Sequence, residues 1–598
     1  MSTETLLPTL DRLGVAVSPK LDVASVTSQW FDPFAQALQS ANTDDIILSL
    51  TEDVFWRDML SLTWDFRTFQ GINKVRQFLT DQLPLFPISS CKLRKELVEF
   101  QTPYPDIAWI QGFFDFETHV GIASGVFRLI PLRDGSWKAH TVYTNLEDLT
   151  GYPELHGPLR DHQPNHGKWA AKRAREVEFL DVDPSVIVVG AGHNGLCAAA
   201  RLKMMGINTL VVEKHERIGD SWRKRYGALC LHDPVWADHM PYLPFPSSWP
   251  VYTPAPKLAD WLESYAHSME LNVWTSSAVT SIVPGKSKRW KVSIARTEGS
   301  VRVFEVDNII FALGFGGNKG HIPEIPGMGE FKGQILHSSQ HNVAADHIGK
   351  KVAVVGSCTS AHDICADYVE HGVDVTMIQR GPTYIMSAKE GIPRAITNHR
   401  EGGLPTHIAD RIGASYPTHI STLLSQRVTK TIAEADKELL DGLRSRGFKL
   451  TFGIQGAGFG LLGASQVGGF YFDVGASPLI INGKIKLKSD GPIQKFTPSG
   501  LLFEDGSTLD ADVILFATGY ADARTAYLEL LPSTLASQVQ PIWGLNPEGE
   551  LNSVTREVGI PGLYCIMGNF ALGRFRSKHL ALQIKAYEEG LPGERYLR

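Results

Sequence analysis

Two segments of this chain join an apolar run of β-branched residues to a turn of small residues, and that combination limits the possible fold most. The first is "VIVVGAGHNG" at residues 186–195, and the second is "VAVVGSCTSA" at residues 352–361. A buried strand that ends in a glycine turn and continues as a helix forms a cradle for a diphosphate. We therefore expect an α/β fold with two Rossmann-like dinucleotide-binding domains, in which parallel strands alternate with crossover helices.

The first turn carries the full glycine pattern. Gly190 permits the tight turn, Gly192 lets a pyrophosphate approach the backbone, and Gly195 lets helix and strand pack closely. Glu213 ends the next apolar run, 23 positions after Gly190, where an acid accepts hydrogen bonds from ribose hydroxyls. These four residues predict a tightly held adenine dinucleotide.

The second turn departs from that pattern. Gly356 keeps the tight turn, but Cys358 takes the place of the second glycine. The position that corresponds to Glu213 is Gln379, and Arg380 follows it. A guanidinium pairs with a 2′-phosphate that a carboxylate would repel, so this turn favours NADP(H), held more loosely than the first cofactor. The alternative is a turn that has lost its ligand. The residues predicted to contact NADP(H) are Gly356, Ser360, Ala361 and Arg380.

The bulk composition narrows the class of partner. Apolar residues make up 43% and charged residues 20% of the 598 residues, as in globular proteins, and this length predicts several domains. A formal net charge of −6 gives no reason to expect nucleic acid. Six scattered cysteines without a C-x-x-C pair favour a reduced, cytoplasmic protein over a disulfide framework or a metal site. We predict no signal peptide and no membrane span, because no apolar run reaches 18 residues.

Short motifs between and after the two turns add a family resemblance. In their order along the chain they resemble those of the flavin-containing monooxygenase family, and most closely its plant auxin-forming, YUCCA-like branch. The resemblance covers about two thirds of the chain, from residue 185 onwards. The motif positions are Gly219, Trp222, Arg225, Tyr226, 229–234, 244–246, 261–266, Phe331, Gly333, His337, Thr518 and Gly519.

This resemblance implies FAD at the first turn and NADPH at the second. In such enzymes NADPH reduces FAD, O2 adds at C4a of the flavin, and one oxygen atom passes to a small organic substrate while the other leaves as water. It also implies that Trp222 and Arg225 lie at the FAD site, and that Thr518 and Gly519 bind cofactor where the chain returns to the flavin domain.

Two histidines are the candidate catalytic residues. His232 aligns with the asparagine that the animal enzymes place near the flavin ring. His337 ends the F-x-G-x-x-x-H motif, and it either links the two nucleotide domains or is a core histidine. His341 stands where the family motif has an aromatic residue, and the W-P pair of dedicated Baeyer–Villiger enzymes is missing.

These residues are compatible with several reactions. The substrate could be oxidised at a heteroatom, at a carbonyl or as a 2-oxo acid similar to indole-3-pyruvate, and Baeyer–Villiger insertion is less favoured. A flavin-dependent NADPH oxidase or reductase that releases peroxide, or a dinucleotide sensor without catalysis, would also use both turns. A disulfide reductase is disfavoured because no redox cysteine pair is present.

The N-terminal part has a different pattern of apolar and aromatic residues. A helical opening leads into aromatic-rich segments of period two, which predicts an α+β unit with a curved antiparallel sheet. The stretch "LSLTEDVFWRDMLSLTWDFRTFQGINKVRQFL" resembles the SnoaL/NTF2-like cone fold. We expect this unit to cover the enzyme or to form a homodimer, and Asp58 to be a structural residue rather than a pocket carboxylate.

The expected domain limits follow from these segments. They are 1–155 for the SnoaL/NTF2-like unit, 156–184 for a basic linker, 185–349 for the first part of the FAD domain, 350–485 for the NADPH domain with a substrate-side insertion, and 486–598 for the return segment of the FAD domain.

Overall fold

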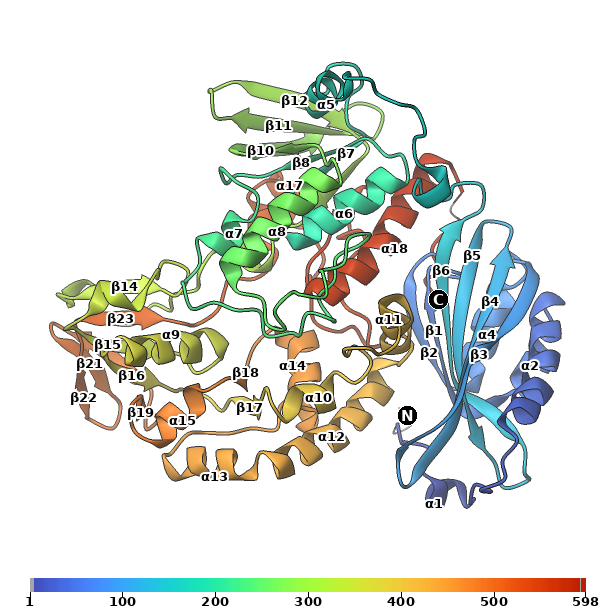
Figure 1. Ribbon diagram of the computed structural model, residues 1–598, viewed down its shortest axis with the longest axis horizontal. Coiled ribbons are helices and arrows are strands. Elements are labelled where there is room, and N and C mark those ends of the chain that lie inside the picture. Colours follow the sequence, from blue (N-terminus) through green and yellow to red (C-terminus); the bar gives the residue numbers. More distant parts are fainter. Residues whose placement is uncertain (1–4, 592) are drawn as a thin grey trace.

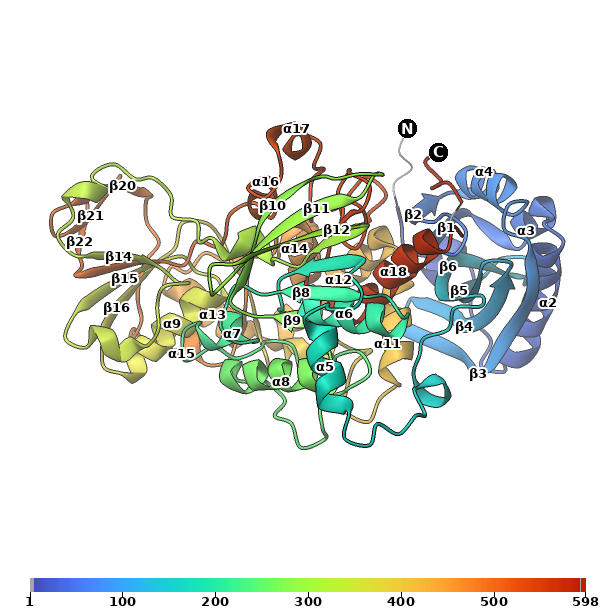
Figure 2. The same ribbon diagram turned by 90° about the horizontal axis from the view of Figure 1, so that it is seen from above.

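Two five-stranded parallel sheets lie in the larger part of the molecule, and a six-stranded sheet forms the smaller part (Figure 1). The computed structural model describes residues 5–591 and 593–598. Seen from above, the second parallel sheet and the six-stranded sheet occupy opposite ends, with the first parallel sheet between them (Figure 2). The predicted α/β architecture with parallel sheets is confirmed.

The first parallel sheet has the strand order β24, β13, β7, β8, β9. Its strands β7, β8 and β13 are buried on both faces, as expected for a sheet covered by helices. Helix α6 crosses from β7 to β8 and packs against α18 near the C-terminus. The elements are β7 (Val186–Val189), α6 (His193–Met204), β8 (Thr209–Val212), α7 (Asp220–Arg223), α8 (Ala255–Ser268), β9 (Val273–Trp274), β13 (Asn308–Phe311), β24 (Leu563–Cys565) and α18 (Phe570–Glu588).

The second parallel sheet has the order β14, β23, β15, β16, β19, with α9 as its first crossover helix. A three-stranded antiparallel sheet accompanies each parallel sheet. The elements of this sheet are β14 (Gln334–His337), β15 (Lys351–Val355), α9 (Thr359–Glu370), β16 (Asp374–Ile378), β19 (Lys486–Lys488) and β23 (Val513–Phe516). The accompanying strands are β10 (Ser277–Pro284), β11 (Trp290–Arg296) and β12 (Val301–Val306), and β20 (Ile493–Thr497), β21 (Gly500–Phe503) and β22 (Thr508–Asp510).

The strand pairing shifts the expected boundaries at 349/350 and 485/486. β14 lies before residue 350, yet it pairs with β23 of the second sheet, and β23 lies after residue 486 and pairs with β15. Among the described strands that follow residue 486, only β24 returns to the first sheet, beside β13. The chain therefore enters the second sheet earlier, and leaves it later, than the two glycine turns indicate, because edge and central strands without a turn motif carry no such signal.

A helical insertion follows the second glycine turn. The short strands β17 and β18 pair in parallel, and the helices between them approach the six-stranded sheet (Figure 1). The elements are β17 (Tyr384–Ser387), α10 (Gly391–Ala395), α11 (Thr406–Ala414), α12 (Thr418–Ala435), α13 (Lys437–Ser445), α14 (Gly458–Gln466), β18 (Phe470–Asp473) and α15 (Ala476–Ile481). Further helices outside the insertion include α1 (Leu10–Leu13), α5 (Trp169–Val177), α16 (Thr525–Leu528) and α17 (Ser533–Ala536).

The N-terminal unit contains a six-stranded sheet of order β2, β1, β6, β5, β4, β3. Only β1 and β6 pair in parallel, and α2 covers one face of the sheet, where Trp30 lies 4.6 Å from the Phe34 and Phe127 ring centres. The elements are α2 (Val23–Gln39), α3 (Thr43–Leu48), β1 (Leu50–Met59), β2 (Phe66–Gln70), α4 (Ile72–Gln82), β3 (Ile88–Tyr104), β4 (Ile107–Thr118), β5 (Gly121–Pro131) and β6 (Trp137–Leu149). Among the described helices, none is both long and apolar enough to cross a membrane.

Asp58 lies on β1, in the interior of this unit. Its carboxylate accepts hydrogen bonds from the Leu62 and Thr63 N–H groups at 3.1 and 3.0 Å and from the Thr144 hydroxyl at 2.6 Å. A fully buried carboxylate with this many donors is a structural group, as the sequence predicts.

Candidate active site

The first glycine turn has the geometry of a pyrophosphate cradle. Gly190 has a φ of +108°, and a Cβ there would lie 2.7 Å from the Ala312 carbonyl oxygen. A Cβ on Gly195 would lie 2.0 Å from the Gly190 carbonyl oxygen, so helix α6 touches the turn. A Cβ on Gly192 would meet nothing within 4 Å. The open side of the turn is thus the N-terminus of α6, where a diphosphate binds backbone N–H groups.

Glu213 follows β8 at the same edge of the sheet. Its carboxylate accepts a hydrogen bond from the Ala191 N–H at 2.8 Å and one from the His215 N–H at 2.9 Å. These bonds fix the carboxylate beside the turn and leave it lone pairs for ribose hydroxyls.

The second turn repeats the backbone of the first. Gly356 has a φ of +133°, and a Cβ there would lie 2.5 Å from the Ala517 carbonyl oxygen. Cys358 is the N-cap residue of α9, as Gly192 is of α6. Ala361 is buried in the helix, and Arg380 is exposed just after β16, at the sheet edge where the turn lies.

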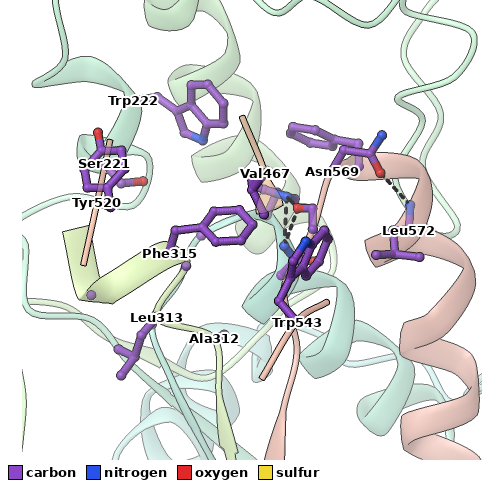
Figure 3. Close-up of a pocket in the computed structure, with 18 of the residues that line it drawn as sticks. Ser221, Trp222, Ala312, Leu313, Phe315, Val467, Tyr520, Trp543, Asn569 and Leu572 are labelled. Atoms are coloured by element: carbon purple, nitrogen blue, oxygen red, sulfur yellow. Dashed lines mark hydrogen bonds between the residues drawn. The ribbon is translucent and has the colours of Figure 1, made fainter. Parts of the chain in front are cut away.

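One cavity of about 970 Å³ has residues of both turns in its wall, and Figure 3 shows part of that wall. Seven of the residues predicted from the sequence line it, and seven do not. The lining residues are Gly190, Gly192, Glu213, Trp222, Arg225, His232 and Ser360. Those outside the wall are Gly195, His337, Gly356, Ala361, Arg380, Thr518 and Gly519.

His232 lies in the cavity wall with its ring 6.1 Å from the Phe472 ring centre. Burial and the nearby Arg225 guanidinium lower the pKa of His232 to about 4, so the imidazole is neutral near pH 7. The Arg225 guanidinium lies 5.5 Å from the Tyr226 ring centre, and the Tyr226 hydroxyl donates a hydrogen bond to Asp363 on α9 at 2.9 Å. Burial raises the pKa of Asp363 to about 7.

His337 lies at the end of β14, where the chain crosses between the two sheets. Its Nδ1 is 2.9 Å from the Ser339 hydroxyl, and a Cβ on Gly320 would lie 2.1 Å from that nitrogen. Its ring meets the Tyr520 ring edge-on at 5.7 Å. Burial lowers the pKa of His337. His337 does not line the cavity, so this position fits the domain-linking role better than the catalytic one, and both stay predictions.

Thr518 and Gly519 follow β23 at the same crossing. The Thr518 hydroxyl donates to the His321 carbonyl, and the Gly519 carbonyl accepts from the His321 N–H at 3.0 Å. They tie two crossing segments together and do not line the cavity, and their contact with a cofactor stays a prediction.

Sequence reasoning missed most of the apolar wall. Most of these residues come from the insertion and from the segment before β24, which carry no diagnostic motif, while Phe315 follows β13 and Leu572 lies on α18. The Phe315 and Trp543 rings face one another edge-on at 5.3 Å (Figure 3). The apolar lining side chains include Phe315, Phe459, Val467, Phe470, Phe472, Trp543, Leu545, Leu551 and Leu572.

Two missed carboxyl groups also line the cavity. Asp233 accepts a hydrogen bond from the Asn569 amide at 2.9 Å, next to the N-terminus of α18. Asp238 is 1% exposed, and neither of its carboxylate oxygens has a hydrogen-bond partner among the described residues. Burial, and for Asp238 the nearby Asp233, raises the pKa of both groups, which favours the protonated form. A neutral carboxyl can donate a hydrogen bond to a molecule in the cavity.

The geometry of the first turn fits a flavin adenine dinucleotide. The diphosphate has an open cradle at Gly192, the ribose has Glu213, and the cavity extends from there to Trp222, Asn569 and Phe570, at the N-terminus of α18. The sequence pattern of the "Flavin-binding monooxygenase-like" family matches residues 184–539, which is more than half of the chain. The chain belongs to this family.

Individual relatives agree with this assignment. The indole-3-pyruvate monooxygenase YUCCA4 of Oryza sativa subsp. japonica is 28% identical over 383 residues, which cover 60% of this chain and 81% of the relative. The probable indole-3-pyruvate monooxygenase YUCCA3 of Arabidopsis thaliana is 28% identical over 351 residues, covering 57% and 74%. A crystal structure of cyclohexanone monooxygenase with epsilon-caprolactone bound has a TM-score of 0.50 at 17% identity, covering 68% of this chain and 88% of that one, and shows the shared fold.

The family membership confirms the predicted class of enzyme. The chain is a flavin-binding monooxygenase. The matched region begins at residue 184, so the N-terminal unit lies outside it.

Proposed function

We propose that the enzyme transfers one atom of O2 to a small organic substrate held in the 970 Å³ cavity, with NADPH as the electron donor. The observation that carries this proposal is the cavity itself, because the walls of one space include the first glycine turn and Ser360 of the second. A flavin and a nicotinamide must meet for hydride transfer, and a common cavity provides the place.

We assign FAD to the first turn, through Gly190, Gly192, Gly195, Glu213, Trp222 and Arg225. We assign NADPH to the second turn, through Gly356, Ser360, Ala361 and Arg380. Bound FAD supplies the redox and oxygen chemistry. The protein binds and orients the reactants, and the apolar wall excludes water from them. His232, which is neutral near pH 7, can donate or accept a hydrogen bond in the cavity without adding charge.

For the substrate we propose a 2-oxo acid or another carbonyl compound, with heteroatom oxidation as the alternative. Support comes from the relatives, which are indole-3-pyruvate monooxygenases, and from the aromatic lining, which suits an apolar body. Baeyer–Villiger insertion is less favoured because the W-P pair is missing.

We propose that the N-terminal unit is a SnoaL/NTF2-like domain of about residues 1–155, that 156–184 is a linker, and that the protein is cytoplasmic. The sheet with one face covered by helices supports the domain assignment. A homodimer through this unit is a further proposal, which sedimentation of the full chain tests.

The proposed reaction is tested with 18O2. The purified protein is expected to carry FAD, to lose the flavin absorbance on anaerobic addition of NADPH, and to place one labelled atom in the product of an accepted 2-oxo acid. An NADPH oxidase would instead convert the consumed oxygen to H2O2 with or without substrate. A protein whose bound FAD is not reduced by NADPH would contradict both readings and leave only a dinucleotide sensor.

A further inference from the structure

The N-terminal unit contributes a residue to the wall of the active-site cavity. Arg57, on β1, is among the lining side chains, together with Thr418, Gly549 and Arg576 from the rest of the chain. Arg57 Nε and Nη2 donate to the two carboxylate oxygens of Glu550 at 2.6 and 2.7 Å, and Nη1 donates to the Ala414 carbonyl.

Arg576 is the second cation at this end of the cavity. It lies on α18, a helix that runs beside the six-stranded sheet in both views (Figures 1 and 2). The Arg576 side chain is 6% exposed. Its Nη2 is 3.8 Å from Glu550, beyond hydrogen-bond distance, and its Nη1 has no hydrogen-bond partner among the described residues. Burial lowers the pKa of Arg576 to about 10, so the guanidinium is still charged near pH 7.

The charges around this point do not balance. The cluster has three guanidiniums, on Arg57, Arg556 and Arg576, and two carboxylates, on Glu550 and Asp65. Arg57 and Arg576 share the single carboxylate of Glu550, and Arg556 pairs with Asp65 at 3.1 Å. One positive charge is therefore left without a carboxylate among the described side chains of the cluster. An unpaired charge in so buried a place costs several kcal/mol unless an anion joins it.

We propose that Arg57 and Arg576 form a subsite for the anionic group of the substrate, and that the N-terminal unit thereby completes the substrate pocket. The ligand is a small molecule with an apolar body and one carboxylate: the body lies against Trp543, Leu545 and Leu551, and the carboxylate accepts hydrogen bonds from Arg576. This inference rests on the proposed function, since it places the substrate in the same cavity. Arg57, Glu550 and Arg576 all lie outside the residues that match the family, 184–539.

A pair of unreactive probes tests this subsite: 3-phenylpropionate, which carries a carboxylate, and 3-phenylpropionamide, which is neutral and has the same shape. Binding of each to the FAD-loaded enzyme is followed by the perturbation of the flavin spectrum and by calorimetry. The wild-type enzyme is expected to bind the acid at least about tenfold more tightly than the amide, as one charge-assisted hydrogen bond would give.

Four substitutions separate a charge effect from a structural one. R57Q and R576Q each remove the excess positive charge and should abolish the preference for the acid, whereas R576K should keep most of it. E550Q removes a negative charge and should strengthen the preference, although it breaks the same network. A purely structural role predicts weaker binding of both probes in all four variants.

Arg67 provides the matched control. It lies on the neighbouring strand β2 and pairs with Glu548 at 2.8 Å across the same interface, but it does not line the cavity. R67Q is expected to leave the preference unchanged. Equal affinities of the wild-type enzyme for the two probes, or no binding of the acid at millimolar concentration, would overturn the subsite. Failure of the proposed function would differ, since the protein would then lack FAD or its FAD would resist NADPH.

Discussion

Cys358 stands at the N-cap of α9, in the place that Gly192 holds at the N-cap of α6. The turns are otherwise alike: Gly190 and Gly356 both have positive φ, and a Cβ at either position would clash with a backbone carbonyl oxygen. The space above Gly192 is open, whereas at the second turn a side chain occupies the corresponding position. A single side chain can therefore make the two turns of one chain differ in their affinity for a dinucleotide.

This difference predicts the effect of C358G. Removal of the side chain lets the pyrophosphate of NADPH approach the backbone N–H groups of α9, so the Kd for NADPH should fall by about fivefold, roughly one neutral hydrogen bond. The Kd is obtained from the rate of anaerobic flavin reduction at varied NADPH concentration. C358A, which keeps a Cβ, should lie between C358G and the wild type. Weaker NADPH binding in C358G would show that the thiol side chain contacts the cofactor favourably.

Arg380 predicts the choice between NADPH and NADH. It is exposed at the carboxyl end of β16, where the 2′-phosphate of a cofactor on the second turn would lie. R380A should lower kcat/KM for NADPH by about ten- to a hundredfold, as expected for one to two charge-assisted hydrogen bonds, and leave the value for NADH nearly unchanged. R444A, which removes an exposed arginine on α13, is the control. An unchanged ratio of the two cofactors in R380A would rule out the assignment.

The first turn allows a test that separates folding from FAD binding. Because a Cβ at Gly195 would lie 2.0 Å from a backbone oxygen, G195A should destabilise the apoprotein by about 3 kcal/mol or more. G192A has open space for its methyl group and an N-cap φ of −70°, so the melting temperature of its apoprotein should be unchanged. That methyl group would nevertheless occupy the place of the pyrophosphate, and G192A should therefore retain little FAD on purification. The absorbance ratio of flavin to protein and the melting temperature of the apoproteins check both statements, and normal flavin content in G192A would place the cofactor elsewhere.

The features that could be predicted from the sequence are those whose interacting residues lie close together along the chain. Both turns could be read from the sequence because strand, glycines and helix lie within about ten residues of one another and each carries its own steric requirement. The pair Arg57 and Glu550 is separated by 493 positions, and no local pattern marks either residue as its partner. His337 belongs to a motif that the sequence displays clearly, yet only the crossing of β14 with the segments at Gly320 and Tyr520 distinguishes a linking residue from a catalytic one.

The contact between the N-terminal unit and the insertion predicts a sensitivity to acid. Glu147, on β6, accepts two hydrogen bonds from Arg411 on α11, both at 2.6 Å. Burial alone would raise the pKa of Glu147, but the Arg411 guanidinium outweighs it and lowers the pKa to about 2. Because this value lies below the ordinary 4.5 of the unfolded chain, the pair stabilises the folded protein fully above about pH 4.5. That stabilisation decreases as the pH falls from 4.5 towards 2.

The variant E147Q removes this dependence. Its unfolding free energy should be lower than that of the wild type by on the order of 3 kcal/mol near pH 7, and the difference should shrink as the pH falls from 4.5 towards 2. Urea titrations followed by tryptophan fluorescence at several pH values give the two curves. D441N is the control, because the pairs of Asp441 with Lys437 and Arg444 are exposed and water screens them. Parallel curves for the wild type and E147Q down to pH 3 would mean that folding does not lower the pKa of Glu147. If instead the N-terminal unit separates before the rest unfolds, proteolysis within the linker at 156–184 should begin in the same pH interval, and earlier in E147Q.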